Sequence, residues 1–469
     1  MAENTKHLHI VMFPWFAIGH MTPYLHLANK LAEKGHKISF LSPNKAKLQL
    51  QHLNLHPDLI TLHSLAIPVV KGLPSGAETA SDVPISQVSP LATAMDMTRP
   101  QVEERVCELR PDFVFYDSAH WVPEITSSLG IKSVCYNVVC AASIVIALVP
   151  ARNVTREWDI TEEELANPPP GYPSSIVILH KHEARNLLFI SKEFGDGITF
   201  YERITTALKN CDAIAIRTCS ELEGNFCNYL ASQYNKPVFL TGPVLPEPKE
   251  SQLESHWSEW LGKFAPGSVI FCAFGSQFIL DKNQFQELLS GFESTGLPFL
   301  LALKPPTGCS TIEEAFPKGF EERVKGRGLV HGGWVQQPLI LSHPSVGCFV
   351  NHCGFGSMWE GLKTEAQLVL VPQLGDQILN TRLMAGDLKV AVEVEREESG
   401  WVSKESLCKA IKAVMDEGSG VGSIVRENHA KWREILVSQG FMSGYIDSFI
   451  KDLEGLLASG VELVNHYPR

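Results

Sequence analysis

The segment "VGCFVNHCGFGSMWEGL", residues 346–362, is the most informative part of the chain about its fold. An apolar run leads to His352, Gly354 and Gly356 follow it, and a helical pattern begins at Ser357. This order predicts a strand, a tight glycine turn and a helix. The unpaired N–H groups at such a helix start attract anions, and phosphate fits them well. A tight turn with a capping serine explains the same residues, and this segment alone leaves both interpretations open.

Apolar runs alternate with helical patterns along the whole chain. This alternation is typical of βαβ units, so it predicts an α/β fold with two doubly wound, mostly parallel sheets. Ligands of such sheets bind at the carboxyl ends of the strands. The strands are expected at residues 7–13, 37–41, 112–117, 131–137, 213–218 and 236–240 in the first half, and at 268–274, 298–303, 328–332, 346–351, 367–372 and 389–395 in the second.

Four segments are expected in the domain organisation. Residues 1–240 form an N-terminal Rossmann-like domain, and residues 256–440 form a C-terminal one. Between them, 241–255 is rich in Pro, Glu and Ser without periodicity, which favours a linker. The last part, 441–469, contains an amphipathic helix that is expected to pack back on the N-terminal domain.

The composition excludes several classes of protein. The chain has 469 residues and a net charge of −12, so it has no general attraction to nucleic acid or anionic membranes. Its longest apolar run, residues 138–150, is too short to span a bilayer, and the apolar run near the N-terminus is too short for a signal peptide. The eleven cysteines contain no C-x-x-C pair. We therefore expect a cytoplasmic protein, most simply a monomer.

A histidine follows the first predicted strand, in "FPWFAIGHMTP" (13–23). The strand ends at Phe13, a loop containing Gly19 and His20 follows, and Thr22 is predicted to cap the next helix. A histidine beside a helix N-terminus is disfavoured in its charged form, so it could accept a proton. A half-buried loop histidine without a chemical role is the alternative interpretation.

A carboxylate follows another strand at the same predicted sheet edge. Asp117 comes directly after the apolar run in "VFYDSAHW" and could bond the far nitrogen of His20 and stabilise its imidazolium. It could equally cap a helix over 119–129. The chain has no D-x-D, H-E-x-x-H, G-x-S-x-G or complete G-x-G-x-x-G, which favours chemistry without a metal and disfavours a dehydrogenase.

From Trp334 to Gln377 the chain reads "WVQQPLILSHPSVGCFVNHCGFGSMWEGLKTEAQLVLVPQLGDQ". This resembles the signature box of plant UDP-dependent family 1 glycosyltransferases. "GHMTP" with His20, "FYD" with Asp117 and "AFGS" at 273–276 also fall where that family places them. The resemblance covers essentially the whole chain. It implies the GT-B fold, in which two Rossmann-like domains face each other across a cleft.

The resemblance also implies roles for individual residues. The catalytic pair would be His20 as general base and Asp117 as its partner. Trp334 would stack on uracil, Gln337 and Glu360 would bind ribose, and the sugar would be read by Asp376 and Gln377. His352, Ser357 and Ser276 would contact the diphosphate, so the glycine turn would hold a UDP-sugar. The donor set is completed by Gly19, Val335, Gly354 and Gly356, the predicted acceptor residues are Phe16, Trp121 and Val138, and no metal or other cofactor is expected.

One departure from the common box points to a branch of the family. This chain has Phe355 and Gly356 where the common form has tryptophan and asparagine. The "HCGFGS" form resembles enzymes that add a sugar to a sugar already attached to a flavonoid or anthocyanin. The implied activity is inverting transfer from a UDP-sugar, with glucose favoured and xylose or rhamnose possible, to a hydroxyl of a 3-O-glycoside. The alternatives are transfer to a flavonoid or terpenoid aglycone, and nucleotide-sugar binding without transfer.

Overall fold

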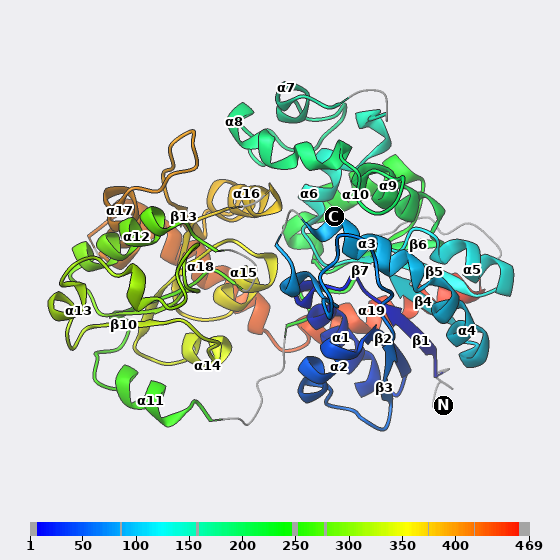
Figure 1. Ribbon diagram of the computed structural model, residues 1–469, viewed down its shortest axis with the longest axis horizontal. Coiled ribbons are helices and arrows are strands. Elements are labelled where there is room, and N and C mark those ends of the chain that lie inside the picture. Colours follow the sequence, from blue (N-terminus) through cyan, green and yellow to red (C-terminus); the bar gives the residue numbers. More distant parts are fainter. Residues whose placement is uncertain are drawn as a thin grey trace. The chain divides into compact units, whose positions relative to one another are not determined.

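The structure is a computed structural model that describes residues 7–84, 87–155, 159–245, 252–275, 279–373, 375–416 and 418–458. The chain divides into two compact units. The first unit comprises Met1–Pro173, Ala184–Pro246 and Met442–Arg469, and the second comprises Ser174–Glu183 and Glu247–Phe441. Each unit is an α/β body built on its own sheet (Figure 1).

The sheet of the first unit has seven strands in the order β3-β2-β1-β4-β5-β6-β7, and every neighbouring pair is parallel. The order reverses between β1 and β4, which pair with Phe13 opposite Tyr116. The predicted doubly wound topology is therefore confirmed. The strands are β1 (His9–Phe13), β2 (Lys37–Pro43), β3 (Ile60–Leu65), β4 (Phe113–Tyr116), β5 (Lys132–Asn137), β6 (Ala213–Ile216) and β7 (Val238–Leu240).

The sheet of the second unit has six strands in the order β10-β9-β8-β11-β12-β13, again all parallel. Its four central strands, β9, β8, β11 and β12, are mostly buried, as expected where helices cover both faces, whereas the edge strand β10 is half-buried. The strands are β8 (Val269–Ala273), β9 (Phe299–Ala302), β10 (Gly328–His331), β11 (Val346–Asn351), β12 (Gln367–Leu370) and β13 (Ala391–Glu393).

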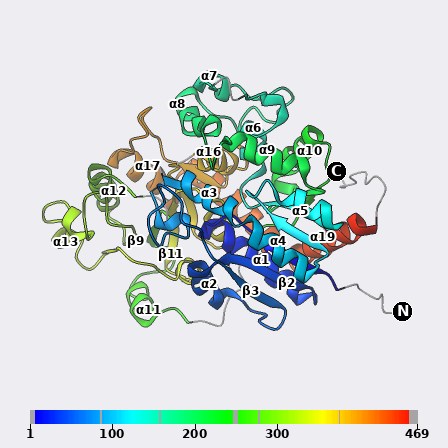
Figure 2. The same cartoon turned by 45° about the vertical axis from the view of Figure 1, so that its right-hand side comes forward.

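Helices connect the strands in both units (Figures 1 and 2). In the first unit they are α1 (Ile18–Glu33), α2 (Asn44–Leu50), α3 (Val88–Met97), α4 (Arg99–Leu109), α5 (Val122–Leu129), α6 (Ala141–Ala147), α7 (Glu162–Ala166), α9 (Phe200–Asn210) and α10 (Ser220–Tyr234). The short helix α8 (Lys181–Ala184) begins in the second unit, and its last residue is assigned to the first. The second unit contains α11 (Ser255–Leu261), α12 (Lys282–Thr295), α13 (Phe320–Arg323), α14 (Gln337–Leu341), α15 (Phe355–Leu362), α16 (Gly375–Thr381), α17 (Lys404–Met415) and α18 (Gly420–Val437). None of the described helices is both long enough and apolar enough to cross a membrane.

The last helix, α19 (Phe441–Ala458), packs into the core of the first unit. Its apolar face contributes Ile446, Phe449 and Leu453 to a cluster that also contains Ile10 of β1. The ring of Phe449 meets Phe115 of β4 edge-on, with the ring centroids 6.0 Å apart. The C-terminal end of the described chain is thereby part of the same core as the first strand.

The start of α1 differs from the sequence prediction. The helix begins at Ile18 rather than after Thr22, because the N–H groups of His20 and Met21 already donate to the Ala17 carbonyl. Pro23 lies inside the helix, where its missing N–H sacrifices one backbone hydrogen bond near the N-terminal end. His20 therefore stands in the first turn of α1 and not in a preceding loop.

Two other segments differ from expectation. The start of the predicted linker is held in place, because the buried Arg217 donates to the carbonyls of Pro243 and Val244. Most of the rest, 246–251, lies outside the described residues. Ser174–Glu183, expected in the N-terminal domain, groups with the second unit, where Glu183 is paired with arginines.

Candidate active site

The structure brings His20 and Asp117 together at the carboxyl edge of the first sheet. His20 Nδ1 lies 2.7 Å from Asp117 Oδ2. They meet because β1 and β4 are neighbours, and each residue follows the end of its strand. The His20 side chain is 30% exposed, whereas that of Asp117 is 6% exposed. With Nδ1 donating to the carboxylate, Nε2 is the ring nitrogen that is left to accept a proton.

The Asp117 carboxylate is fixed by the backbone around it. Its Oδ1 accepts hydrogen bonds from the N–H groups of Trp15 at 2.7 Å and Ser118 at 2.5 Å. It does not cap α5, whose N-cap residue is Trp121, so the helix-cap alternative is wrong. These two hydrogen bonds fix the orientation of the carboxylate, whose Oδ2 contacts the imidazole of His20.

The fully buried Arg203 of α9 contacts the residues around Asp117. Its guanidinium donates to both oxygens of Asp96, to the carbonyl of Ser118 and to the carbonyl of Phe194. The Phe194 ring in turn packs on Trp15 with centroids 5.4 Å apart. The two residues that donate to Asp117 are therefore themselves held by one arginine.

The predicted acceptor residues all lie buried in the first unit. Phe16 packs against Phe13 at a centroid distance of 5.8 Å. The Trp121 indole N–H donates to Asp96, and Val138 belongs to the core cluster of β1 and α19. Their packing accounts for these side chains, so an acceptor role for them stays a prediction.

In the second unit, His352 lies between two glycines. A Cβ on Gly275 or on Gly354 would come within 2.8 or 2.7 Å of the His352 ring. The backbone of Gly354 is extended, with φ −60°, so this glycine is needed to accommodate the ring rather than for an unusual turn. Burial lowers the pKa of His352 to about 4, against a smaller effect of the Ala273 backbone. The ring is therefore neutral near pH 7 and offers an N–H rather than a positive charge.

Side chains that sequence reasoning missed hold the turn before α15. Cys353 adopts a left-handed conformation, with φ 67°. Its N–H donates to Asn351 Oδ1 at 2.9 Å, its carbonyl accepts from Asn380 Nδ2 at 2.8 Å, and its sulfur accepts from Thr381 Oγ1 at 2.7 Å. These contacts tie the turn to α16, so two parts of the predicted donor site form one structure.

Three of the predicted donor residues are hydrogen-bonded to one another. Gln337 Nε2 at the start of α14 lies 2.8 Å from Glu360 Oε2 and 3.4 Å from Ser357 Oγ, both in α15. Trp334 is 78% exposed, which is unusual for an indole, while Val335 beside it is buried. An exposed aromatic face next to polar groups suits stacking on a planar ring.

Asp376, Gln377 and Ser276 follow neighbouring strands of the second unit, whereas Gly19 lies in the first turn of α1 in the first unit. Asp376 and Gln377 begin α16 after β12, and the Gln377 side-chain oxygen accepts from the N–H of Gln373 at 3.0 Å. Ser276 follows β8 but lies outside the described residues. Because β8, β11 and β12 are adjacent, the residues that follow them share one sheet edge. Within the described residues, no group of three or more His, Cys, Asp or Glu is placed to hold a metal ion.

Comparisons with known proteins agree with this arrangement. Residues 325–428 match the family model described as UDP-glucoronosyl and UDP-glucosyl transferase. An anthocyanidin 3-O-glucoside 2'''-O-xylosyltransferase of Arabidopsis thaliana is 58% identical over 98% of this chain and 99% of its own length. The chain belongs to the family 1 UDP-glycosyltransferases. It is therefore a member of a transferase family, and the resemblance seen in the sequence is confirmed.

A second relative and a solved structure also match the chain. The UDP-glucosyl transferase 79T1 of Saponaria officinalis is 56% identical over 97% of this chain and all of its own length. The crystal structure of Glycyrrhiza uralensis UGT73P12 matches with a TM-score of 0.79 over 96% of each chain at 21% identity. The predicted GT-B fold, with its two Rossmann-like α/β domains, is thus confirmed.

Proposed function

We propose that this glycosyltransferase moves a sugar from a UDP-sugar to a hydroxyl of a sugar already attached to a flavonoid or anthocyanin, as a 3-O-glycoside. The observation that carries the proposal is the 58% identity, over nearly the whole chain, to an enzyme named for transfer to an anthocyanidin 3-O-glucoside. Glucose is the favoured donor sugar, and xylose or rhamnose are the alternatives. The similarity to enzymes named for xylosyl and for glucosyl transfer supports testing xylose beside glucose.

His20 acts as the general base in this proposal. Its Nε2 takes the proton from the acceptor hydroxyl, whose oxygen attacks the anomeric carbon of the donor. The Asp117 carboxylate stabilises the imidazolium through the 2.7 Å contact to Nδ1. The new carbon–oxygen bond forms as the bond to the diphosphate breaks, so one displacement inverts the anomeric centre.

The second unit holds the donor in this proposal. Trp334 stacks on uracil, and the ribose hydroxyls replace the contact that Gln337 and Glu360 make with each other. The diphosphate binds at the start of α15, where peptide N–H groups, the neutral His352 ring and Ser357 donate to it. Since these groups can offset the charge of the leaving UDP, we propose that turnover needs no metal. Full activity in excess EDTA would support this, and loss of activity restored by Mg²⁺ would contradict it.

The experiment is a grid of donors and acceptors. UDP-glucose, UDP-xylose and UDP-rhamnose are each incubated with a flavonol, its 3-O-glucoside and an anthocyanidin 3-O-glucoside, and the products are identified by mass spectrometry. We expect a disaccharide product from a glycoside acceptor. Product from the aglycone alone would support the alternative of direct aglycone transfer. UDP-sugar binding by calorimetry without any product would support a binding protein.

The proposal also covers the compartment and the oligomeric state of the protein. We propose a cytoplasmic monomer that does not bind nucleic acid. All eleven cysteines are free, which suits a reducing compartment, and the net charge is −12. Light scattering coupled to size-exclusion chromatography should give a mass near 51.9 kDa, and a mass of twice that value would contradict the monomer.

A further inference from the structure

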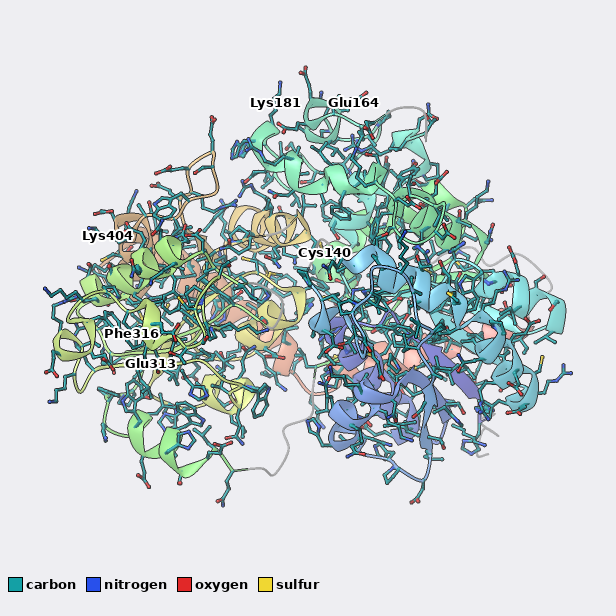
Figure 3. All side chains as sticks on the ribbon, in the orientation of Figure 1. Cys140, Glu164, Lys181, Glu313, Phe316 and Lys404 are labelled. Atoms are coloured by element: carbon teal, nitrogen blue, oxygen red, sulfur yellow. The ribbon has the colours of Figure 1, made fainter. Side chains whose placement is uncertain are left out.

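Glu183 is a buried acid far in sequence from the donor box, yet it lies in the second unit. It is only 3% exposed, and its Oε1 accepts from Arg382 Nη2 at 2.6 Å and from Arg396 Nη2 at 3.0 Å. Its other oxygen accepts from the N–H of His180 at 2.9 Å, which fixes the carboxylate on its own segment. Lys181, two residues earlier, is exposed and lies at the outer margin of the ribbon (Figure 3).

Glu183 completes a balanced cluster of charges. Arg382 also pairs with Glu393 at the end of β13, and Arg396 approaches the same carboxylate. Two arginines thus face two glutamates, and the side chains of Arg382 and Arg396 are 14% and 10% exposed. Removing Glu183 would leave the two cations sharing one acid in a poorly hydrated place, and breaking a buried pair in this way is costly.

This cluster holds both ends of the segment that carries Asp376 and Gln377. On the C-terminal side, α16 runs directly into a π-helical turn, Arg382–Asp387, whose first residue is bonded to Glu183. On the N-terminal side, Arg396 Nη1 donates to the carbonyl of Pro372 at 3.3 Å, in the loop before α16. A change at the cluster would therefore move the start and the end of α16 together.

A second, apolar contact joins the same two segments. A Cβ on Gly386, in the π-helical turn, would come within 2.9 Å of Ile176 Cγ2. Ile176 lies in Ser174–Glu183, so this segment meets the turn after α16 at two separate points. π-helical turns inside helices occur often at functional sites.

We infer that Glu183 is a positioning residue that sets the orientation of Asp376 and Gln377, and so helps to determine which donor sugar the enzyme accepts. The inference rests on the proposed function, because Asp376 and Gln377 are assigned to the sugar there. Glu183 itself touches neither donor nor acceptor in this account. It acts through Arg382 and Arg396, whose contacts flank the sugar-reading segment.

The test measures donor selectivity together with UDP affinity in Glu183→Gln. Selectivity is the ratio of kcat/KM for UDP-glucose and UDP-xylose, or the ratio of their inhibition constants where only one is turned over. We expect this ratio to change about tenfold, because residues that share one hydrogen-bond and ion-pair network are energetically coupled. The dissociation constant of UDP, measured by calorimetry, should stay within about twofold of wild type, since UDP lacks the sugar. Lys181→Gln, in the same segment, is the matched control and should leave both quantities unchanged.

Several outcomes would overturn the inference. An unchanged ratio would do so, and so would an equal fall for both donors accompanied by weaker UDP binding, because that would indicate a purely structural role. If Glu183→Gln does not fold, Arg396→Lys tests the same device, since lysine keeps the charge but cannot bond both Glu183 and Pro372 in the same way. Failure of the proposed function is distinct, because it would appear as a wild-type enzyme that transfers no sugar from any donor.

Discussion

The carboxyl edges of the two sheets differ in how far the protein itself occupies their polar and aromatic groups. In the first unit the Asp117 carboxylate already has its hydrogen-bond partners, and Arg203 fixes the residues that donate to it. In the second unit Trp334 is exposed, and Gln337 and Glu360 are bonded to each other. The first edge leaves one ring nitrogen open, whereas the second offers groups that a ligand can engage.

In the proposed function, this difference separates the residues of the chemical step from those that bind the donor. A general base needs a fixed orientation and a fixed tautomer, and a network of hydrogen-bonded buried groups provides both. A donor site must exchange its internal contacts for those of the ligand, so exposed and mutually paired groups suit it. Variants at the first edge should therefore alter turnover or folding, and variants at the second should alter affinity.

The largest expected effect is at His20. His20→Ala removes the proton acceptor, so kcat should fall by about 10²–10⁴-fold. UDP affinity should stay near wild type, because the uracil, ribose and diphosphate contacts are assigned to the second unit. Turnover assays and calorimetry on the same preparation check this. Wild-type turnover in this variant would contradict the assignment of His20 as the general base, and with it the functional distinction between the two edges.

The next effect concerns the stability of the first edge. Arg203→Leu leaves Asp96 without its cation and the Ser118 carbonyl without its donor, so the free energy of unfolding should fall by about 3 kcal/mol. Urea denaturation measures it. Arg105→Leu is a suitable control, because Arg105 makes an exposed pair with Glu108 and should cost less than about 1 kcal/mol. Equal losses in the two variants would mean that the first edge is not specially held.

A binding effect is expected at the second edge. Trp334→Ala should weaken UDP binding by about 10- to 100-fold, since a base stacked on an aromatic ring contributes about 1–3 kcal/mol. The thermal midpoint should not change, because the indole is 78% exposed. Trp334→Phe should retain most of the affinity. A Trp334→Ala variant that binds UDP normally but melts earlier would reverse the assignment.

The smallest expected effect is an acid sensitivity of the second unit. Burial lowers the pKa of His429 to about 4, below its ordinary value of 6.5. As the pH falls below about 6.5, the unfolded chain binds a proton at His429 that the folded chain does not. The free energy of unfolding therefore decreases between pH 6.5 and pH 4, and the contribution of His429 is fully present above pH 6.5. His429→Gln should reduce the stability difference between pH 7.5 and pH 5 by about 1–2 kcal/mol.

The control for this measurement is His256→Gln, because His256 is largely exposed. It should leave the pH dependence unchanged. A pH dependence in His429→Gln that equals that of wild type, as in this control, would contradict the prediction. It would mean that folded His429 is protonated without cost, although it is only 2% exposed.

The sequence predicted the central strands and the contact between His20 and Asp117 because both follow from local patterns. Apolar runs mark buried parallel strands, and residues that follow neighbouring strands must share an edge, which is why His20 and Asp117 meet. The edge strand β3 was missed, since Ile60–Leu65 mixes exposed and buried residues and contains a histidine. The start of α1 was misplaced because Thr22-Pro23 looks like a helix start in isolation.

The supports of the site could not be predicted in this way. Asn380 and Thr381 hold Cys353 across 27 and 28 positions, Arg203 reaches Asp96 across 107, and Glu183 reaches Arg382 across 199. No local periodicity encodes such distances. A buried arginine or glutamate gives one signal in the sequence, an isolated charge within an apolar context, but that signal does not name its partner.

The path of the chain constrains how relatives of this enzyme can be recombined. The hydrophobic face of α19 fills the same core as β1, so this helix belongs structurally with the N-terminal strands although it follows the second unit in the sequence. A chimera with a single junction near residue 246 would combine strands from one parent with a filling helix from the other. Exchanging the first unit between members of the family therefore calls for two junctions, with α19 transplanted together with the N-terminal strands.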